Sequence, residues 1–75
     1  MKKIYLFEFY YINPKNGTWS LYKNFRVGLY DKRKELADLK RKGYVYNRKE
    51  KAYIQEPEPT EGQGDRAVMV KSYEI

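Results

Sequence analysis

Tyrosines and basic residues are interleaved between positions 44 and 53, a combination typical of surfaces that bind nucleic acid. Unpaired bases stack on aromatic rings, and each stacked base contributes about 1–3 kcal/mol. Cations add affinity for phosphate that does not depend on base sequence and that falls as the salt concentration rises. The alternative for each tyrosine is ordinary packing, with the ring in the core and the hydroxyl at its margin. The residues that we expect to contact nucleic acid or another partner are Arg33, Lys34, Lys40, Arg41, Tyr44, Tyr46, Arg48, Lys49, Lys51 and Tyr53.

Residues suited to catalysis or metal binding are scarce. The 75 residues include no cysteine and no histidine, which removes the most reactive nucleophile and the commonest metal ligand. Glu8 stands alone in an apolar segment, and a salt link with a neighbouring cation is its expected role. Gly62-Gln63-Gly64 lacks the strand and helix that flank a phosphate-binding loop. We therefore expect a protein that is not an enzyme and that has no metal and no cofactor.

The net charge of +6 is concentrated in the middle of the chain. Residues 15–51 hold twelve Lys and Arg against four Asp and Glu, whereas residues 52–75 hold two against five. This distribution favours a polyanionic partner for the middle segment, or a basic surface that is simply solvated.

A short helix is expected over residues 31–42. Asp31 is a suitable N-cap, and Gly43 tolerates the left-handed conformation that ends many helices. Leu36 and Leu39 form a narrow apolar stripe. A stripe of this width suits a helix that lies across one face of a sheet.

The cations of this helix gather on one flank. Asp38 and Lys42 lie on the other flank, at the spacing of an i,i+4 ion pair. We expect the cationic flank to have no internal partner and to be free for an external one. At 100° per residue it contains Arg33, Lys34, Lys40 and Arg41.

A hairpin with a turn at residues 47–50 is expected to follow the helix. In the expected register Tyr44 faces Tyr53. Two residues further on, Tyr46 faces Lys51 on the same side of the hairpin. This side would then present rings and a cation together, with Arg48 and Lys49 at the tip.

A longer hairpin is expected at the start of the chain, from residues 3–12 and 18–27. The Asn13-Pro14-Lys15-Asn16-Gly17 segment between them is a strong turn sequence. If Ile12 pairs with Thr18, one face of the hairpin is almost wholly apolar and is the expected core face. It gathers Tyr5, Phe7, Phe9, Tyr11, Trp19, Leu21, Lys23 and Phe25.

Residues 56–65 contain two Pro, two Gly and four acidic residues, which predicts a mobile acidic loop. Alternation resumes over residues 66–75 and predicts a last strand. The expected fold is therefore α+β, a single domain over residues 1–75. Its antiparallel sheet has about five strands in the order β-β-α-β-β-β, with one helix packed on one face.

The end of the helix and the second hairpin, Leu39 to Ile54, carry the pattern x-Gly-Tyr-x-Tyr-Asn-x-x-x-Lys-x-Tyr-Ile. This run resembles the helix-then-hairpin unit of the HARP-type accessory domain of some helicases. Tyr53 stands where that unit has a Trp, and Asn47 where it has an Asp. The resemblance implies a DNA-associated role. The richness in Lys, Tyr, Asn and Ile is also similar to that of small phage or mobile-element proteins.

Three functions remain open at this point. The first is a module that contacts RNA or single-stranded DNA. The second is a protein-interaction module, such as a phage-type adaptor or inhibitor that docks on an acidic host protein. The third is a structural domain that forms a homodimer through its second sheet face. Because Glu8 interrupts the apolar start of the chain, we expect no signal peptide, no membrane contact and a cytoplasmic location.

Overall fold

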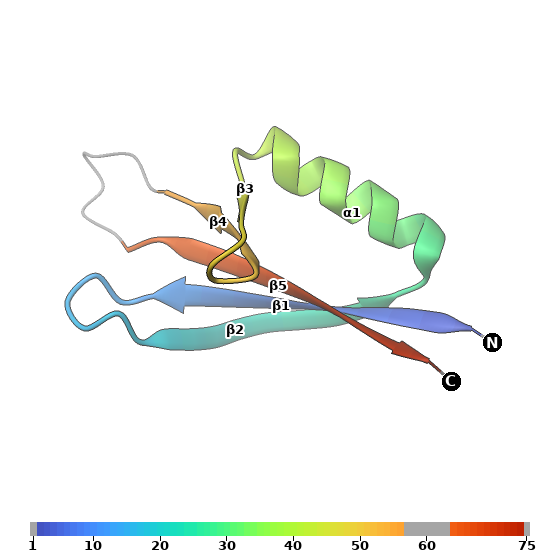
Figure 1. Cartoon of the computed structure of the whole chain (residues 1–75), viewed down its shortest axis with the longest axis horizontal. Coiled ribbons are helices and arrows are strands. Elements are labelled where there is room, and N and C mark those ends of the chain that lie inside the picture. Colours follow the sequence, from blue (N-terminus) through green and yellow to red (C-terminus); the bar gives the residue numbers. More distant parts are fainter. Residues whose placement is uncertain (1, 57–63, 75) are drawn as a thin grey trace.

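The computed structural model describes residues 2–56 and 64–74, and this part of the chain forms one sheet and one helix (Figure 1). The five strands are all antiparallel, in the spatial order β2-β1-β5-β4-β3. The predicted α+β class and the predicted element order are confirmed. In chain order the elements are β1 (Lys3–Ile12), β2 (Trp19–Val27), α1 (Leu29–Arg41), β3 (Val45–Asn47), β4 (Ala52–Gln55) and β5 (Arg66–Glu74).

The hairpin of β1 and β2 has a different register from the predicted one. The Asn13 N–H donates to the Thr18 carbonyl at 2.9 Å, so Thr18 lies opposite Asn13 and not opposite Ile12 as predicted. Ile12 therefore pairs with Trp19 and not with Thr18. A bulge follows between Phe9 and Tyr10 of β1, and beyond it the register has shifted by one more residue.

The extra residue at this bulge is Tyr22, which lies between the partners of Tyr10 and Phe9. Because side chains alternate along a strand, one extra residue exchanges the faces on its two sides. Trp19 and Leu21 share a face with the even-numbered residues of β1, away from the helix. Their predicted place in the core is wrong, because the turn pairs Trp19 with Ile12; the bulge then returns Lys23 and Phe25 to the predicted core face.

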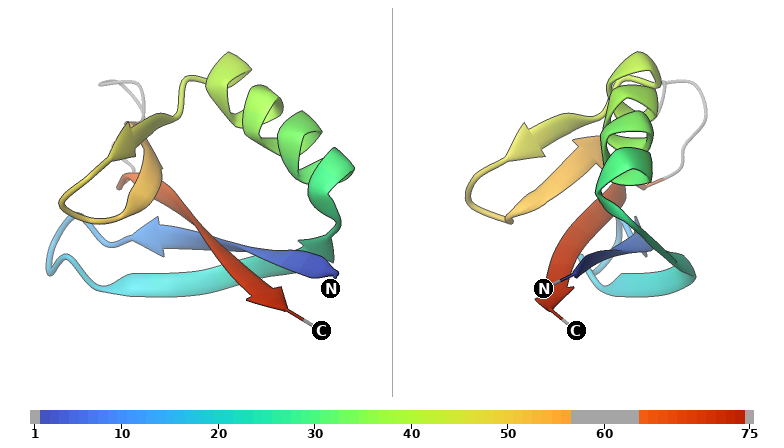
Figure 2. Two further views of the ribbon diagram at one scale, coloured as in Figure 1. Left: turned by 45° about the vertical axis from the view of Figure 1, so that its right-hand side comes forward. Right: turned by 90° about the vertical axis from the view of Figure 1, so that its right-hand side faces the viewer.

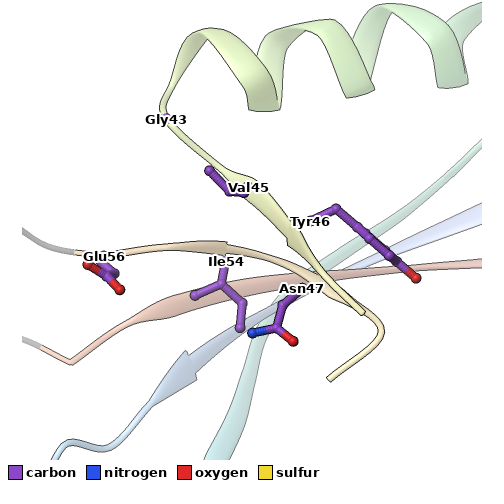
Figure 3. A pocket seen from close by; sticks show the side chains of 6 residues that line it. All are labelled: Gly43, Val45, Tyr46, Asn47, Ile54 and Glu56. Carbon is purple, nitrogen blue, oxygen red and sulfur yellow. The ribbon is translucent and has the colours of Figure 1, made fainter. Parts of the chain in front are cut away.

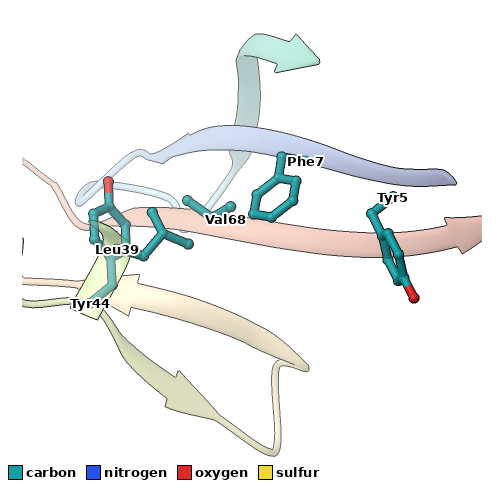
Figure 4. Packing of buried hydrophobic residues seen from close by; sticks show 5 residues of the cluster. All are labelled: Tyr5, Phe7, Leu39, Tyr44 and Val68. Atoms are coloured by element: carbon teal, nitrogen blue, oxygen red, sulfur yellow. The ribbon is translucent and has the colours of Figure 1, made fainter. Parts of the chain in front are cut away.

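The core lies between α1 and the sheet face formed by the odd-numbered residues of β1, and Figure 4 shows the side chains of its buried cluster. Phe7 is fully buried, and its ring stacks on Phe25 with the ring centroids 5.2 Å apart. The buried cluster consists of Tyr5, Phe7, Leu39, Tyr44 and Val68. Phe9, Phe25, Val27, Leu36, Tyr53 and Val70 pack against it. The predicted core face of β1 and the predicted apolar stripe of the helix are both confirmed.

The helix α1 begins two residues before the predicted start. Gly28 is its N-cap, so the prediction of Asp31 as the cap is wrong. Asp31 lies in the first turn instead, where its carboxylate is still at the positive end of the helix dipole. None of the described residues belongs to a helix of the length and apolar character needed to cross a membrane.

Gly64 and Asp65 lead into β5 and pack against the first hairpin. The Ile12 N–H donates to the Asp65 carbonyl at 2.8 Å, and the Gly64 N–H donates to the Tyr11 hydroxyl at 3.3 Å. A Cβ at position 64 would collide with the Ile12 carbonyl oxygen and with the Pro14 ring, so glycine is required there. The rest of the predicted acidic loop, residues 57–63, lies outside the described residues.

Candidate nucleic-acid interface

The end of α1 sets the position of the hairpin that follows it. Gly43 adopts a φ of 90°, which glycine reaches without strain. The Gly43 N–H donates to the Lys40 carbonyl at 3.1 Å, and the Tyr44 N–H donates to the Leu39 carbonyl at 3.0 Å. These two bonds form a Schellman motif, which satisfies carbonyls that the helix end leaves free. The motif confirms Gly43 as the predicted terminator and aims Tyr44 into the core.

Tyr44 therefore does not offer a free ring face. Its side chain is 7% exposed, and burial raises the pKa of its hydroxyl, with the neighbouring Tyr22 adding to the effect. In the core it contacts the buried cluster that includes Leu39, the partner expected of it in a Schellman motif. Of the three predicted stacking tyrosines, this one packs the core.

The other two tyrosines meet on the β3–β4 hairpin. Tyr46 pairs with Tyr53, and their ring centroids lie 5.0 Å apart at an interplanar angle of 64°. This is an edge-to-face contact, a favoured arrangement of aromatic rings. The predicted pairings of Tyr46 with Lys51 and of Tyr44 with Tyr53 are wrong, because the four-residue turn lies one residue later than predicted, which shifts the register. Tyr53 is half-buried, whereas Tyr46 is 50% exposed.

The turn itself comprises residues 48–51. The Asn47 Oδ1 accepts a hydrogen bond from the Glu50 N–H at 3.0 Å, which holds the turn closed. Lys51 completes it in the left-handed region, with a φ of 55°. The first two residues of the turn are exposed cations at the tip of the hairpin, Arg48 and Lys49.

A groove of about 330 Å³ runs between α1 and this hairpin, over the sheet. In both views of Figure 2 the hairpin lies to the left of the helix. Two cations lie at the groove, Lys32 from the helix and Lys51 from the hairpin turn. The other lining residues are Tyr5, Leu36, Tyr46, Tyr53, Val70 and Ser72.

Sequence reasoning missed Lys32 and Tyr5 as members of this site. The Lys32 Nζ lies 4.3 Å from the centroid of the Tyr5 ring, close enough for a cation–π contact. Lys32 precedes Leu36 by four residues, so the helical period places it on the same stripe. That spacing is the signal that identifies Lys32, whereas Tyr5 was assigned to the core face alone.

Two predicted cations of the helix lie beside the groove and not in its lining. Arg33 and Lys40 stand three residues before and four residues after Leu36, so the helical period places them in a stripe next to this lining residue. Both side chains are exposed. Within residues 2–56 and 64–74, neither forms an ion pair with a carboxylate.

The other two predicted helix cations have partners inside the chain. The Arg41 guanidinium lies 3.0 Å from the Asp38 carboxylate, which also pairs with Lys42 at 3.0 Å as predicted. The Lys34 Nζ lies 4.7 Å from the centroid of the exposed Tyr30 ring. The expectation that the whole flank has no internal partner is therefore wrong. Among the described residues, only Arg33 and Lys40 of this flank lack an internal partner, as expected.

Two further hollows differ from the groove in their charge. A cavity of about 440 Å³ on the other side of α1 has both signs at its edge, including Glu35 and Asp38. A hollow of about 460 Å³ on the far side of the hairpin has no cation in its lining, which consists of Gly43, Val45, Tyr46, Asn47, Ile54 and Glu56 (Figure 3). Each of these two hollows has at least one carboxylate in its lining, so neither offers cations and an exposed aromatic ring without a carboxylate nearby.

Comparison of the chain with protein-family models, with curated proteins and with solved structures found no match. The resemblance of residues 39–54 to the HARP-type unit is thus not accompanied by a family match. The geometry of the groove is what bears on function.

Proposed function

We propose that this chain is a non-enzymatic module that binds single-stranded RNA or single-stranded DNA in the groove between α1 and the β3–β4 hairpin. The observation that carries the proposal is the half-exposed Tyr46 ring, which stands in a groove with Lys32 and Lys51 at its sides. A volume of about 330 Å³ is at the lower end of the range for small-ligand sites and suits a single unpaired base.

The roles of the residues follow from their positions. The base stacks on Tyr46, whose edge-to-face contact with Tyr53 holds its ring in place. The phosphates on either side of that base meet the cations of the helix stripe and of the hairpin turn. A base held in a duplex cannot reach such a ring, so the proposal favours single strands over double strands. The phosphate-contacting cations are Lys32, Arg33, Lys40, Arg48, Lys49 and Lys51.

A salt series with a charge variant tests the electrostatic part of this proposal. Nuclease-treated protein is titrated into a labelled single-stranded oligonucleotide of mixed sequence, between about 50 and 200 mM salt. For a single strand, removal of one cation that neutralises a phosphate lowers the slope of log affinity against log salt by about 0.7. We expect Arg33→Gln combined with Lys40→Gln to lower this slope by about 1.4, since two such cations are removed.

Lys15→Gln is the control, because Lys15 lies in the exposed β1–β2 turn, away from the groove. It should leave the slope unchanged. The proposal fails if the wild type shows no binding at the lowest salt, or if the double variant and the control have the same slope. Capture of an acidic protein that survives nuclease and moderate salt would instead favour a protein-interaction module.

A further inference from the structure

The sheet face opposite α1 is not covered by any described segment (Figure 2). It carries the even-numbered residues of β1, which alternate with the buried odd-numbered ones. β2 adds Trp19 and Leu21, and β5 contributes Met69 and Tyr73, which pair with residues of this face. Leu21 is 47% exposed and Tyr73 is 48% exposed. A monomer rarely leaves a contiguous apolar surface of this kind in water.

The charge of this face differs from that of the rest of the molecule. In β1, β2 and β5 its charged side chains are Glu8, Arg26 and Lys71, a net charge of +1. The whole chain carries +6. Lys71 is already paired with Glu8, so among the described residues Arg26 is the one charged side chain of these three strands on this face without an ion pair. A second copy of this basic chain therefore meets little repulsion here.

An ion pair near the centre makes the face complementary to itself. The Lys71 Nζ lies 2.8 Å from a Glu8 carboxylate oxygen, and the two residues are diagonal neighbours on the adjacent strands β1 and β5. A two-fold axis brings the same patch of two copies together, so that every contact occurs twice. Each Lys71 can then approach Glu8 of the second copy, while the surrounding apolar side chains meet one another.

The size of the face is of the order that a dimer needs. β1, β2 and β5 have 10, 9 and 9 residues. At about 3.3 Å per residue and about 4.8 Å between strands, they form a face about 30 Å long and about 14 Å wide, to which β3 and β4 add. The product is about 420 Å², about half of the ~800 Å² that each partner contributes to a standard interface, before the area of β3 and β4 is added.

We propose that this chain forms a homodimer in which the open sheet faces of two copies pack on each other. The result is a sheet-on-sheet sandwich with the two layers about 10 Å apart. Its interior contains Leu6, Tyr10, Ile12, Trp19, Leu21 and Met69 of each copy. The two helices and the two grooves then lie on the outer surfaces, so dimer formation leaves both grooves open.

The test compares two leucines that are equally exposed on different faces. Leu21 is 47% exposed on the open face, and Leu29 is 50% exposed on α1. Sedimentation equilibrium over a range of concentrations should give the wild type twice the 9.1 kDa mass of one chain. Leu21→Glu should sediment as a monomer at concentrations where the wild type is a dimer, because a carboxylate would be buried at the interface. Leu29→Glu should remain a dimer.

Trp19, the single tryptophan, reports the same event by fluorescence. Its emission should move to longer wavelength in Leu21→Glu and stay unchanged in Leu29→Glu. If circular dichroism shows that Leu21→Glu is unfolded, Tyr73→Glu takes its place on the same face. A wild type that sediments as a monomer at every concentration overturns the proposal, as do open-face variants that remain dimeric. These outcomes are independent of oligonucleotide binding, which the Arg33 and Lys40 variant measures separately.

Discussion

Replacement of Tyr46 by alanine separates its proposed role in binding from its role in packing. The ring is 50% exposed in the groove, so its outer face is available to a base. Loss of one stacked base weakens binding by about 1–3 kcal/mol, which corresponds to an increase in Kd of about 5- to 150-fold. We expect an increase within this range for a single-stranded oligonucleotide at fixed salt.

The same substitution should affect stability much less. The variant lacks the edge-to-face contact between Tyr46 and Tyr53, and such contacts contribute about 0.5–1.5 kcal/mol. Tyr44→Ala removes instead a ring that is only 7% exposed, and burial of this kind is worth about 3–5 kcal/mol. Because a small domain is stable by only about 5–15 kcal/mol, the Tyr44 variant should be close to unfolding while the Tyr46 variant stays folded.

Fluorescence anisotropy gives the Kd, and urea unfolding followed by circular dichroism gives the stability of the same samples. Val45→Ala is the matched control, since Val45 is the neighbouring residue of β3, is 70% exposed and lies on the opposite side of the hairpin. It should bind like the wild type. If folded Tyr46→Ala also binds like the wild type, stacking in this groove is refuted.

Two further predictions concern the helix end and the buried tyrosine. In urea unfolding, Gly43→Ala should lower the free energy of unfolding by about 1–2 kcal/mol, and Gly43→Asn should lower it by less. The reason is backbone strain at a φ of 90°, since no atom lies within 4 Å of an added Cβ. The pKa of Tyr44 is raised by burial, so its hydroxyl ionises more readily in the unfolded chain, and stability should be highest below pH 10 and fall as the pH rises through the folded pKa. Tyr44→Phe should show a shallower alkaline loss in the same measurement; equal slopes would contradict this.

The fold could be predicted because local signals agree with one another. Alternation marked β1, β2 and β5, Gly43 marked the helix end, and the apolar stripe of Leu36 and Leu39 placed the helix on the sheet. The register of the first hairpin could not be read, because it depends on how the turn pairs Ile12 and on a bulge at Tyr22. Such a bulge is set by how the sheet twists, and the alternation of Trp19 and Leu21 looks the same with or without it.

The site was predicted in part for a similar reason. Helical spacing places Arg33 and Lys40 on one face of the helix, but ion pairing of Arg41 depends on the actual geometry of a neighbouring carboxylate. Tyr44 and Tyr46 are two residues apart and look alike in the sequence. Only the Schellman motif decides that the first fills the core and that the second lies at the groove. Packing across the fold, not residue type, separates the two roles.

The strand order also governs how the chain reaches its native state. β1 lies between β2 and β5, so the first strand of the chain cannot be completed until the last one arrives. Closing a loop of almost the whole chain costs entropy before any contact rewards it, and folding dominated by such pairings takes milliseconds to seconds. During synthesis Phe7 and its neighbours therefore remain uncovered on one edge until β5 has been made. The interval before β5 emerges is when this chain is most exposed to aggregation.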